Sequence, residues 1–314
     1  MIDFKTLFYE MAIIPVIKIE SPDKADGLAN ALKAGGLCIA EITFRTRAAP
    51  AVIQHIATHH PDIVVGAGTV MSREDVDAAL DAGAAFIVSP GFNPAICEYC
   101  LKKGAPVFPG VNTPSLIEQA MGLGLSILKF FPAEVSGGTK ALKAFESVYP
   151  QVSFIPTGGV QESNINEYLA CRNVVACGGS WIVPTELIEA GKFEGIEALV
   201  RSARRTVMGF LPLAVSAGVS APSQFATVEV RTPSLARTLA LLQRQGVFVV
   251  PVAAPAALGT ELTTALGTEL TTQAMLGTEL ASLASAGTEL MKGKTAKAVE
   301  VILPDSGVRI RLVS

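Results

Sequence analysis

Residues 127–133 read Ile-Leu-Lys-Phe-Phe-Pro-Ala, a short apolar run with a lysine in its middle. Its length and its boundaries, Ser126 and Pro132, are typical of a buried β-strand. A lysine on such a strand must reach water or lose its charge, because burial disfavours the charged form. A neutral amine attacks carbonyl groups and forms Schiff bases. Taken alone, the stretch favours the simpler alternative, in which Lys129 extends from the strand end to solvent.

Similar apolar runs alternate with helical patterns along the first two thirds of the chain. After a leading helix within residues 2–11, eight strands are predicted at 13–19, 38–44, 63–66, 86–89, 106–109, 127–131, 153–156 and 174–177. Helices are predicted at 23–33, 48–58, 73–82, 94–103, 114–121, 139–148, 162–169 and from 184 to about 207. Eight strand–helix units in about 200 residues favour a closed (β/α)₈ TIM barrel over a doubly wound open sheet. We therefore expect a barrel domain over residues 1–210.

The composition changes after Phe210. Residues 211–222 are rich in Ala, Ser, Gly and Pro, which predicts a linker. Strand patterns at 225–230, 247–252, 298–303 and 308–313, with a helix at 234–245, predict a small α+β unit over residues 223–314. Gly-Thr-Glu-Leu recurs at positions 259, 267, 277 and 287, so we expect a low-complexity insert at about residues 258–290.

Composition narrows the class of protein. The formal net charge of −3 without a basic block argues against nucleic-acid binding. No apolar run is long enough to span a bilayer, and the N-terminus does not resemble a signal peptide. The five scattered cysteines predict reduced thiols and hence a cytoplasmic protein.

In a TIM barrel the chemistry lies at the carboxyl ends of the strands. Glu41 lies in an otherwise apolar strand, where a buried carboxylate can give and take a proton near neutral pH. Arg45, further along, has the planar fork that binds a substrate carboxylate. The alternative is a purely structural ion pair between Glu41 and Arg45.

Two glycine-rich segments end the seventh and eighth predicted strands, namely Gly158-Gly159 and Gly178-Gly179 followed by Ser180. We interpret both as turns that lead into helices. Backbone N–H groups in such turns can approach a phosphate closely, and barrels often bind phosphate after these two strands. The alternative is a pair of ordinary tight turns.

Two further patterns have the spacing of metal or redox sites. Cys97 and Cys100 have no matching second pair and lie on a predicted helix, which favours a structural role. His55 and His59 are one helical turn apart, with His60 beside them, but they lie away from the strand ends. A solvated helix terminus is the favoured interpretation of the histidines.

Six motifs in this sequence resemble those of the bacterial KDPG aldolase family (2-keto-3-deoxy-6-phosphogluconate aldolase), in the family's order. They are Glu-Ile-Thr-Phe-Arg-Thr at 41–46, Val-Gly-Ala-Gly-Thr-Val at 65–70, Phe-Ile-Val-Ser-Pro-Gly at 86–91, Leu-Lys-Phe-Phe-Pro-Ala-Glu at 128–134, Pro-Thr-Gly-Gly-Val at 156–160 and Gly-Gly-Ser-Trp at 178–181. The resemblance covers roughly residues 1–210.

The resemblance implies a class I aldolase of the Entner–Doudoroff pathway that needs neither metal nor cofactor. It would cleave the phosphorylated keto acid to pyruvate and glyceraldehyde 3-phosphate, and also 4-hydroxy-2-oxoglutarate to pyruvate and glyoxylate. The family is typically a homotrimer.

By the same resemblance, Lys129 is the Schiff-base lysine and Glu41 the general acid/base. Arg45 and Thr69 would bind the pyruvate carboxylate, and the glycine pairs with Ser180 would bind the phosphate. The substrate-binding set is Arg45, Thr69, Pro90, Phe131, Gly158, Gly159, Gly178, Gly179 and Ser180.

Three alternatives remain open at this point. One is the sister aldolase for 2-keto-3-deoxy-6-phosphogalactonate, which differs at one stereocentre. Another is a metal-dependent aldolase on a similar barrel. The last is a phosphate-ligand binding or assembly protein with an inert barrel and an active tail. The tail faintly resembles half of a glyoxalase/VOC-type module, but it contains no histidine, which argues against a catalytic metal there.

Overall fold

The computed structural model describes residues 2–208, 227–231, 237–238, 249–251, 298–302 and 309–313. The chain divides into two compact units, Met1–Val207 and Met208–Ser314. The predicted linker at 211–222 and the repeat insert at about 258–290 lie outside the described residues.

The first unit is built on eight parallel strands in the order β7-β6-β5-β4-β3-β2-β1-β8. They are β1 (Ile13–Ile17), β2 (Ile39–Thr43), β3 (Val64–Gly68), β4 (Ile87–Ser89), β5 (Val107–Val111), β6 (Ile127–Phe130), β7 (Ser153–Pro156) and β8 (Cys177–Gly179). Isolated parallel bridges, Phe154 to Val174 and Thr157 to Gly178, bring the two end segments together. The expected (β/α)₈ barrel is confirmed, and the open sheet is wrong.

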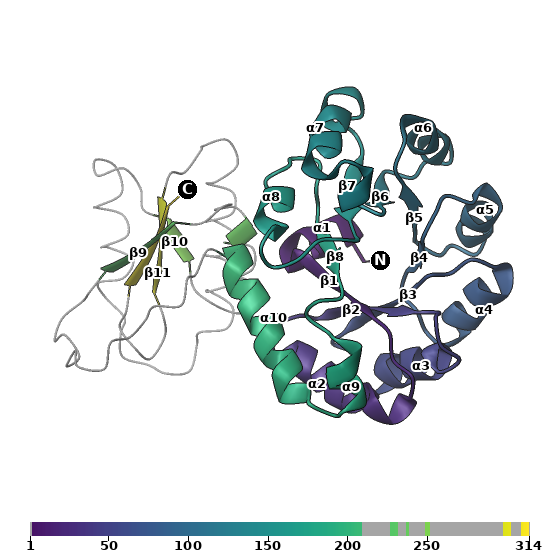
Figure 1. The fold of residues 1–314 in the computed structure, drawn as a ribbon, viewed down its shortest axis with the longest axis horizontal. Coiled ribbons are helices and arrows are strands. Elements are labelled where there is room, and N and C mark those ends of the chain that lie inside the picture. The colour runs from purple at the N-terminus through teal and green to yellow at the C-terminus, as the bar shows by residue number, and fades with distance from the viewer. Residues whose placement is uncertain are drawn as a thin grey trace, which may run out of the picture. The chain divides into compact units, whose positions relative to one another are not determined.

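Helices surround these strands, except that α1 lies over one end of the barrel and not in the outer ring (Figure 1). They are α1 (Phe4–Met11), α2 (Ala25–Ala34), α3 (Ala49–His59), α4 (Arg73–Asp81), α5 (Pro94–Lys102), α6 (Pro114–Gly122), α7 (Gly138–Val148), α8 (Ile165–Leu169), α9 (Thr185–Glu189) and α10 (Phe193–Met208), with 3₁₀ turns η1 (Pro22–Lys24) and η2 (Glu134–Ser136). Local sequence explains several of their starts. Ser72 and Asp75 form a reciprocal capping box on α4, and Pro94 and Pro114 occupy the first turns of α5 and α6, where no backbone donor is lost.

Helix α1 covers the amino ends of β4 and β5. Phe8 of α1 is fully buried, with its ring centroid 5.0 Å from Phe108 and 5.9 Å from Phe86. Phe86 directly precedes β4, and Phe108 is the second residue of β5. Because this aromatic cluster fills that side of the barrel, the opposite, carboxyl ends of the strands are left for chemistry.

Several predicted boundaries differ from the observed ones, and two of these differences have a clear structural explanation. Strand β8 is Cys177–Gly179 rather than 174–177, so Gly178 and Gly179 belong to the strand and do not form a turn after it. A Cβ on Gly178 would overlap with the side chain of Thr157, and one on Gly179 would overlap with the Trp181 ring, so this strand requires glycine. Helix α8 begins at Ile165 rather than at residue 162.

The late start of α8 has a local cause. The side-chain oxygen of Asn164 accepts a hydrogen bond of 2.8 Å from the Gln161 backbone N–H. Asparagine side chains that bond nearby backbone groups in this way compete with helix formation and favour a turn. The predicted extension of the helix to residue 162 was therefore too long.

In the second unit, four described strands form a sheet in the order β10-β11-β12-β9. They are β9 (Thr227–Arg231), β10 (Val249–Pro251), β11 (Ala298–Ile302) and β12 (Arg309–Val313). Strands β11 and β12 are antiparallel, as the predicted hairpin requires, and β9 runs parallel to β12. Residues 237–238 are helical, and the rest of the helix predicted at 234–245 lies outside the described residues. The likeness to half of a VOC-type module stays a prediction.

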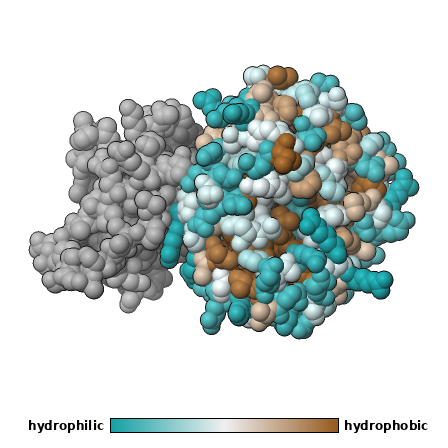
Figure 2. All heavy atoms as spheres, in the orientation of Figure 1, coloured by the Kyte–Doolittle hydropathy of each residue, from teal (hydrophilic) through white to brown (hydrophobic). Residues whose placement is uncertain are grey.

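The surface of the first unit carries hydrophilic residues around much of its outer edge, with apolar residues interspersed (Figure 2). Among the described residues, no helix combines the length and the hydropathy that crossing a membrane requires.

Candidate active site

A lysine and a glutamate from opposite parts of the sequence meet inside the barrel. The Nζ atom of Lys129, on β6, donates a hydrogen bond of 3.1 Å to Oε1 of Glu41, on β2. Both residues are buried, with exposed fractions of 6% and 3%. The interpretation of Lys129 as a side chain that extends to solvent is therefore wrong.

The pair explains how the barrel interior accommodates two ionisable groups. Each alone would cost several kcal/mol to desolvate, whereas together they compensate each other's charge. The structural alternative had paired Glu41 with Arg45, and this is wrong. Arg45 lies two residues beyond β2, is exposed, and forms no ion pair within the described part of the chain.

The Glu41 side chain lies against Gly68, at the end of the neighbouring strand β3. Gly68 pairs with Thr43 of β2, and a Cβ on Gly68 would overlap with Oε1 of Glu41. Thr69 follows directly with φ of 58°, in the left-handed region. A β-branched residue there stores roughly 1–3 kcal/mol of strain, and such strain clusters at functional sites. The positive φ of Thr69 therefore makes the end of β3, beside Glu41, a candidate functional position.

The Phe131 ring lies between Lys129 and the Gly158–Gly159 turn that follows β7. The Lys129 ammonium lies 5.5 Å from the centroid of the Phe131 ring, within cation–π range. A Cβ on Gly158 would be 3.3 Å from the same ring. Gly158 and Gly159 have φ of +93° and +83°, a conformation that L side chains rarely adopt. These residues form the turn that the sequence predicts.

A bracket behind this turn, made of Glu134, Asn164 and Tyr168, was not predicted. The Tyr168 hydroxyl donates to Oε1 of Glu134, and the Glu134 side chain packs where a Cβ on Gly159 would lie. Asn164 Nδ2 donates 3.1 Å to the Gly159 carbonyl, and the Glu134 N–H donates 3.1 Å to the Gly158 carbonyl. Burial, followed by the bond to Glu134, raises the pKa of Tyr168, which keeps its hydroxyl a donor. Only Glu134 lay within a quoted motif, so the other two partners had no sequence signal.

The remaining predicted residues lie at carboxyl ends of strands. Pro90 follows β4 directly and is half-buried, and its carbonyl oxygen lies against Gly110 of β5, the residue paired with Lys129. Ser180 follows β8 directly and is exposed. Pro90 and Ser180 are thus both on the carboxyl side of their strands, as Thr69 is after β3.

The cysteine pair has no reactive character. Cys97 and Cys100 are buried on α5, and burial raises the pKa of each thiol to about 11. The thiolate, which is the nucleophile and metal ligand, is therefore scarce at neutral pH.

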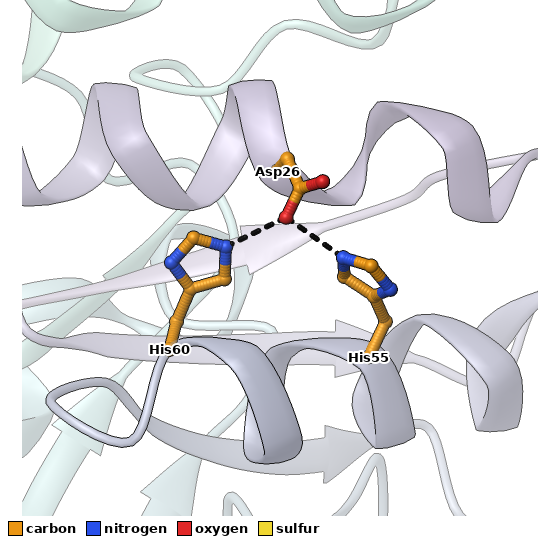
Figure 3. Close-up of side chains that lie close together, drawn as sticks. All are labelled: Asp26, His55 and His60. Carbon is orange, nitrogen blue, oxygen red and sulfur yellow. Dashed lines mark hydrogen bonds and ion pairs between the residues drawn. The ribbon is translucent and has the colours of Figure 1, made fainter.

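Two of the three histidines at this helix end contact a common carboxylate, which the interpretation as a solvated helix terminus did not include. His55 and His60 both contact Asp26, at 2.7 and 2.9 Å from its Oδ1 (Figure 3). His59 instead stacks on His55, with ring centroids 4.2 Å apart, and its Nδ1 lies 3.0 Å from the His55 carbonyl oxygen. Hydrogen bonds from His55 and then from His60 hold the pKa of Asp26 below its ordinary value.

Comparison with known proteins gives a consistent answer. The family model described as KDPG and KHG aldolase matches residues 5–199. The 2-dehydro-3-deoxy-phosphogluconate aldolase of Haemophilus influenzae is 46% identical over 192 residues, which cover 61% of this chain and 91% of that protein. The KHG/KDPG aldolase of Escherichia coli is 40% identical over 191 residues, covering 61% and 90%.

A solved structure agrees with the sequence relatives. The KDPG aldolase of Legionella pneumophila, with pyruvate captured as a covalent carbinolamine intermediate, is 39% identical with a TM-score of 0.62. The match covers 63% of this chain and 97% of that one. Barrel fold and relatives together define the class as an aldolase, a carbon–carbon lyase, built on a (β/α)₈ barrel. More particularly, the chain belongs to the KDPG and KHG aldolase family.

Proposed function

We propose that this chain cleaves 2-keto-3-deoxy-6-phosphogluconate to pyruvate and glyceraldehyde 3-phosphate, with Lys129 as the Schiff-base nucleophile. The observation that carries the proposal is the buried contact of 3.1 Å between Lys129 Nζ and Glu41 Oε1. It puts a nucleophilic amine and a proton acceptor in one water-poor place. The names of the relatives support the substrate, and the carbinolamine of the Legionella pneumophila enzyme supports covalent chemistry on pyruvate.

Proton transfer between Lys129 and Glu41 starts the reaction. The amine must be neutral to attack, and Glu41 is placed to take the proton that the ammonium loses. The nitrogen then bonds to C2 of the keto acid, and loss of water leaves an imine. Once protonated, this imine accepts the electron pair of the breaking bond.

Carbon–carbon cleavage and product release follow from the same two groups. Glu41 takes the proton of the C4 hydroxyl, directly or through water, as the C3–C4 bond breaks into an aldehyde and an enamine. It then returns a proton to C3 of the enamine, and water hydrolyses the resulting imine to release pyruvate. Such general acid–base catalysis contributes about 10²–10⁴-fold in rate.

We assign the carboxylate and the phosphate of the substrate to residues at the carboxyl ends of the barrel strands. Arg45 and Thr69 bind the carboxylate, and Pro90 and Phe131 line the path between the ends. Gly158, Gly159 and Ser180 bind the phosphate through backbone N–H and hydroxyl groups, with Gly178 and Gly179 contributing from the end of β8. The positive φ values at Gly158 and Gly159 support a turn that directs N–H groups toward an anion.

The shorter substrate 4-hydroxy-2-oxoglutarate has the same reacting atoms but no phosphate. We propose that it is cleaved too, to pyruvate and glyoxylate, and the name of the Escherichia coli relative supports this. Since it does not engage the phosphate turn, its specificity constant is expected to be lower. The chemistry requires no metal or cofactor, and we also propose a cytoplasmic homotrimer.

A coupled assay for pyruvate tests the substrate assignment. Lactate dehydrogenase with NADH reports cleavage of the phosphogluconate substrate, of its galactonate epimer and of 4-hydroxy-2-oxoglutarate. We expect the phosphogluconate substrate to have the highest kcat/KM, Lys129→Ala to abolish cleavage, and Lys140→Ala, at an exposed position on α7, to leave it unchanged.

Loss of Lys129 leaves Glu41 buried without its partner, so folding must be checked by thermal unfolding. Glu41→Gln keeps a hydrogen-bond acceptor for Lys129 while removing the base, and it is expected to fold and to be slow. A higher kcat/KM for the galactonate epimer, or full activity in a folded Lys129→Ala variant, would overturn the proposal.

A further inference from the structure

We propose that Asp26, His55 and His60 form a binding site for one divalent transition-metal cation, of which Zn²⁺ is the type, outside the barrel. Asp26 lies on α2, His55 on α3, and His60 directly follows α3 (Figure 3). Imidazole nitrogen and carboxylate oxygen are preferred ligands of such cations. The site is separate from the proposed catalytic pair on β2 and β6.

The three ligand atoms already converge. Oδ1 of Asp26 is 2.7 Å from Nε2 of His55 and 2.9 Å from Nε2 of His60, and all three atoms lie within 4.8 Å of one another. Ligand atoms about 2.0–2.2 Å from a tetrahedral Zn²⁺ are roughly 3.3–3.5 Å apart. A cation therefore requires the carboxylate to retreat by roughly half an ångström, which an exposed side chain achieves by rotation.

Burial determines which atoms can bind. The His60 side chain is only 8% exposed, and its Nδ1 is buried without a hydrogen-bond partner in the described part of the chain. Nε2 is then the nitrogen of His60 that faces a ligand. Asp26 and His55 are 61% and 29% exposed, so solvent reaches the cation and supplies its remaining ligands. Three protein ligands with open positions match the commonest pattern of an accessible zinc site.

The charges also favour a cation. The pKa of Asp26 is held below its ordinary value, so its carboxylate is ionised at neutral pH and supplies the negative charge. In the metal-free cluster, each Nε2 that bonds to Asp26 carries a proton. A bound cation takes the place of this Nε2 proton. If the imidazole is neutral, the proton moves to Nδ1, and if the imidazole is protonated on both nitrogens, the Nε2 proton is released to solvent.

The role of His59 separates this site from the pair suggested by helical spacing. His55 and His59 are one turn apart, but His59 Nδ1 faces the His55 carbonyl oxygen and its ring stacks on His55. His59 is thus outside the set of three and provides a matched control. The chain has three histidines in all, so one variant of each assigns every imidazole signal.

The test is a titration of the chelator-treated full chain with ZnCl₂, monitored by calorimetry and by imidazole ¹⁵N NMR at pH 7.5. We expect one ion per chain and shifts of the His55 and His60 signals. Asp26→Asn and His55→Gln each remove a ligand and should weaken binding by at least the roughly 10–100-fold that loss of an outer-shell partner costs, and His59→Gln by less than about threefold.

Asp26 is exposed, so Asp26→Asn tests the site even if a variant of the buried His60 does not fold. Thermal unfolding without metal confirms that each variant is native. Absence of stoichiometric binding, equal affinity in the wild type and Asp26→Asn, or a loss in His59→Gln as large as in His55→Gln would each overturn the proposal.

Discussion

The contact between Lys129 and Glu41 determines how each of these buried side chains is interpreted. Each side chain alone in the barrel interior would be an uncompensated charge, and their contact of 3.1 Å makes both tolerable. A stability argument does not favour keeping such a pair, because well-packed apolar residues are often equally stable. The pair is therefore better explained by the aldol chemistry proposed above.

Gly68→Ala tests the position of Glu41 without altering a proposed catalytic group. The new methyl group would overlap with the Glu41 carboxylate and push it away from Lys129. Since a displacement of about 1 Å can cost about 10²-fold in rate, kcat should fall by about 10–100-fold. Gly122→Ala is the matched control, because a Cβ there meets nothing within 4 Å. Steady-state kinetics would contradict the account if both variants kept wild-type kcat.

Cysteine reactivity follows from burial. Burial raises the pKa of Cys97 and Cys100 to about 11, so at pH 8 both remain thiols and react slowly with alkylating reagents. Cys38 is the half-exposed cysteine and should be labelled first. Brief iodoacetamide treatment of the native protein, followed by peptide mass spectrometry, should find the label on Cys38. Labelling of Cys97 or Cys100 at the same rate would show that the α5 pair is accessible.

Most strands could be predicted from the sequence, but the contacts between side chains of distant strands could not. Local apolar runs locate β6 and β7 to within a residue, because a buried parallel strand has a clear signal. Strand β8 was misplaced because Gly178 and Gly179 look like a turn, and only the side chains of Thr157 and Trp181 show why they are extended. The Lys129–Glu41 contact spans 88 positions and depends on barrel closure. The resemblance to the family's motifs, and not the spacing of residues in the sequence, assigned Lys129 and Glu41 to one site.

The bracket of Glu134, Asn164 and Tyr168 behind the Gly158–Gly159 turn leads to a prediction about binding of the substrate phosphate. Tyr168→Phe removes the hydrogen bond to Glu134 and should loosen the turn. We expect KM for the phosphorylated substrate to rise by about 3–30-fold, the range for losing about 0.7–2 kcal/mol of binding, with kcat largely kept. The value for unphosphorylated 4-hydroxy-2-oxoglutarate should hardly change.

Tyr149→Phe is the control for this prediction. Tyr149 also bonds a glutamate, Glu118, at 3.0 Å, but on α6 and away from the turn. Tyr149→Phe should leave KM unchanged for both the phosphorylated substrate and 4-hydroxy-2-oxoglutarate. Equal effects of Tyr168→Phe on the two substrates would mean that the bracket serves stability and not phosphate binding. Failure of the wild type to cleave the phosphorylated substrate would instead contradict the proposed function.

For the whole molecule, every proposed site residue lies in the first compact unit, Met1–Val207. The family model matches residues 5–199, and the matches to the two relatives cover about nine tenths of their own length. A variant that ends at Phe210 should therefore fold, assemble as a trimer and keep its kcat/KM within about twofold. Light scattering and the coupled assay measure both properties. Loss of assembly or activity would assign the tail, residues 211–314, a role in the enzyme.

The central claim is that Lys129 forms a covalent imine with pyruvate, and reductive trapping tests it most directly. The full-length protein is incubated with pyruvate and sodium borohydride, digested, and analysed by peptide mass spectrometry. We expect one reduced pyruvyl group on Lys129, with loss of activity in proportion to labelling, and no labelling when pyruvate is omitted. An unlabelled Lys129 in inactivated enzyme, or a label on another lysine that tracks the loss of activity, would contradict it.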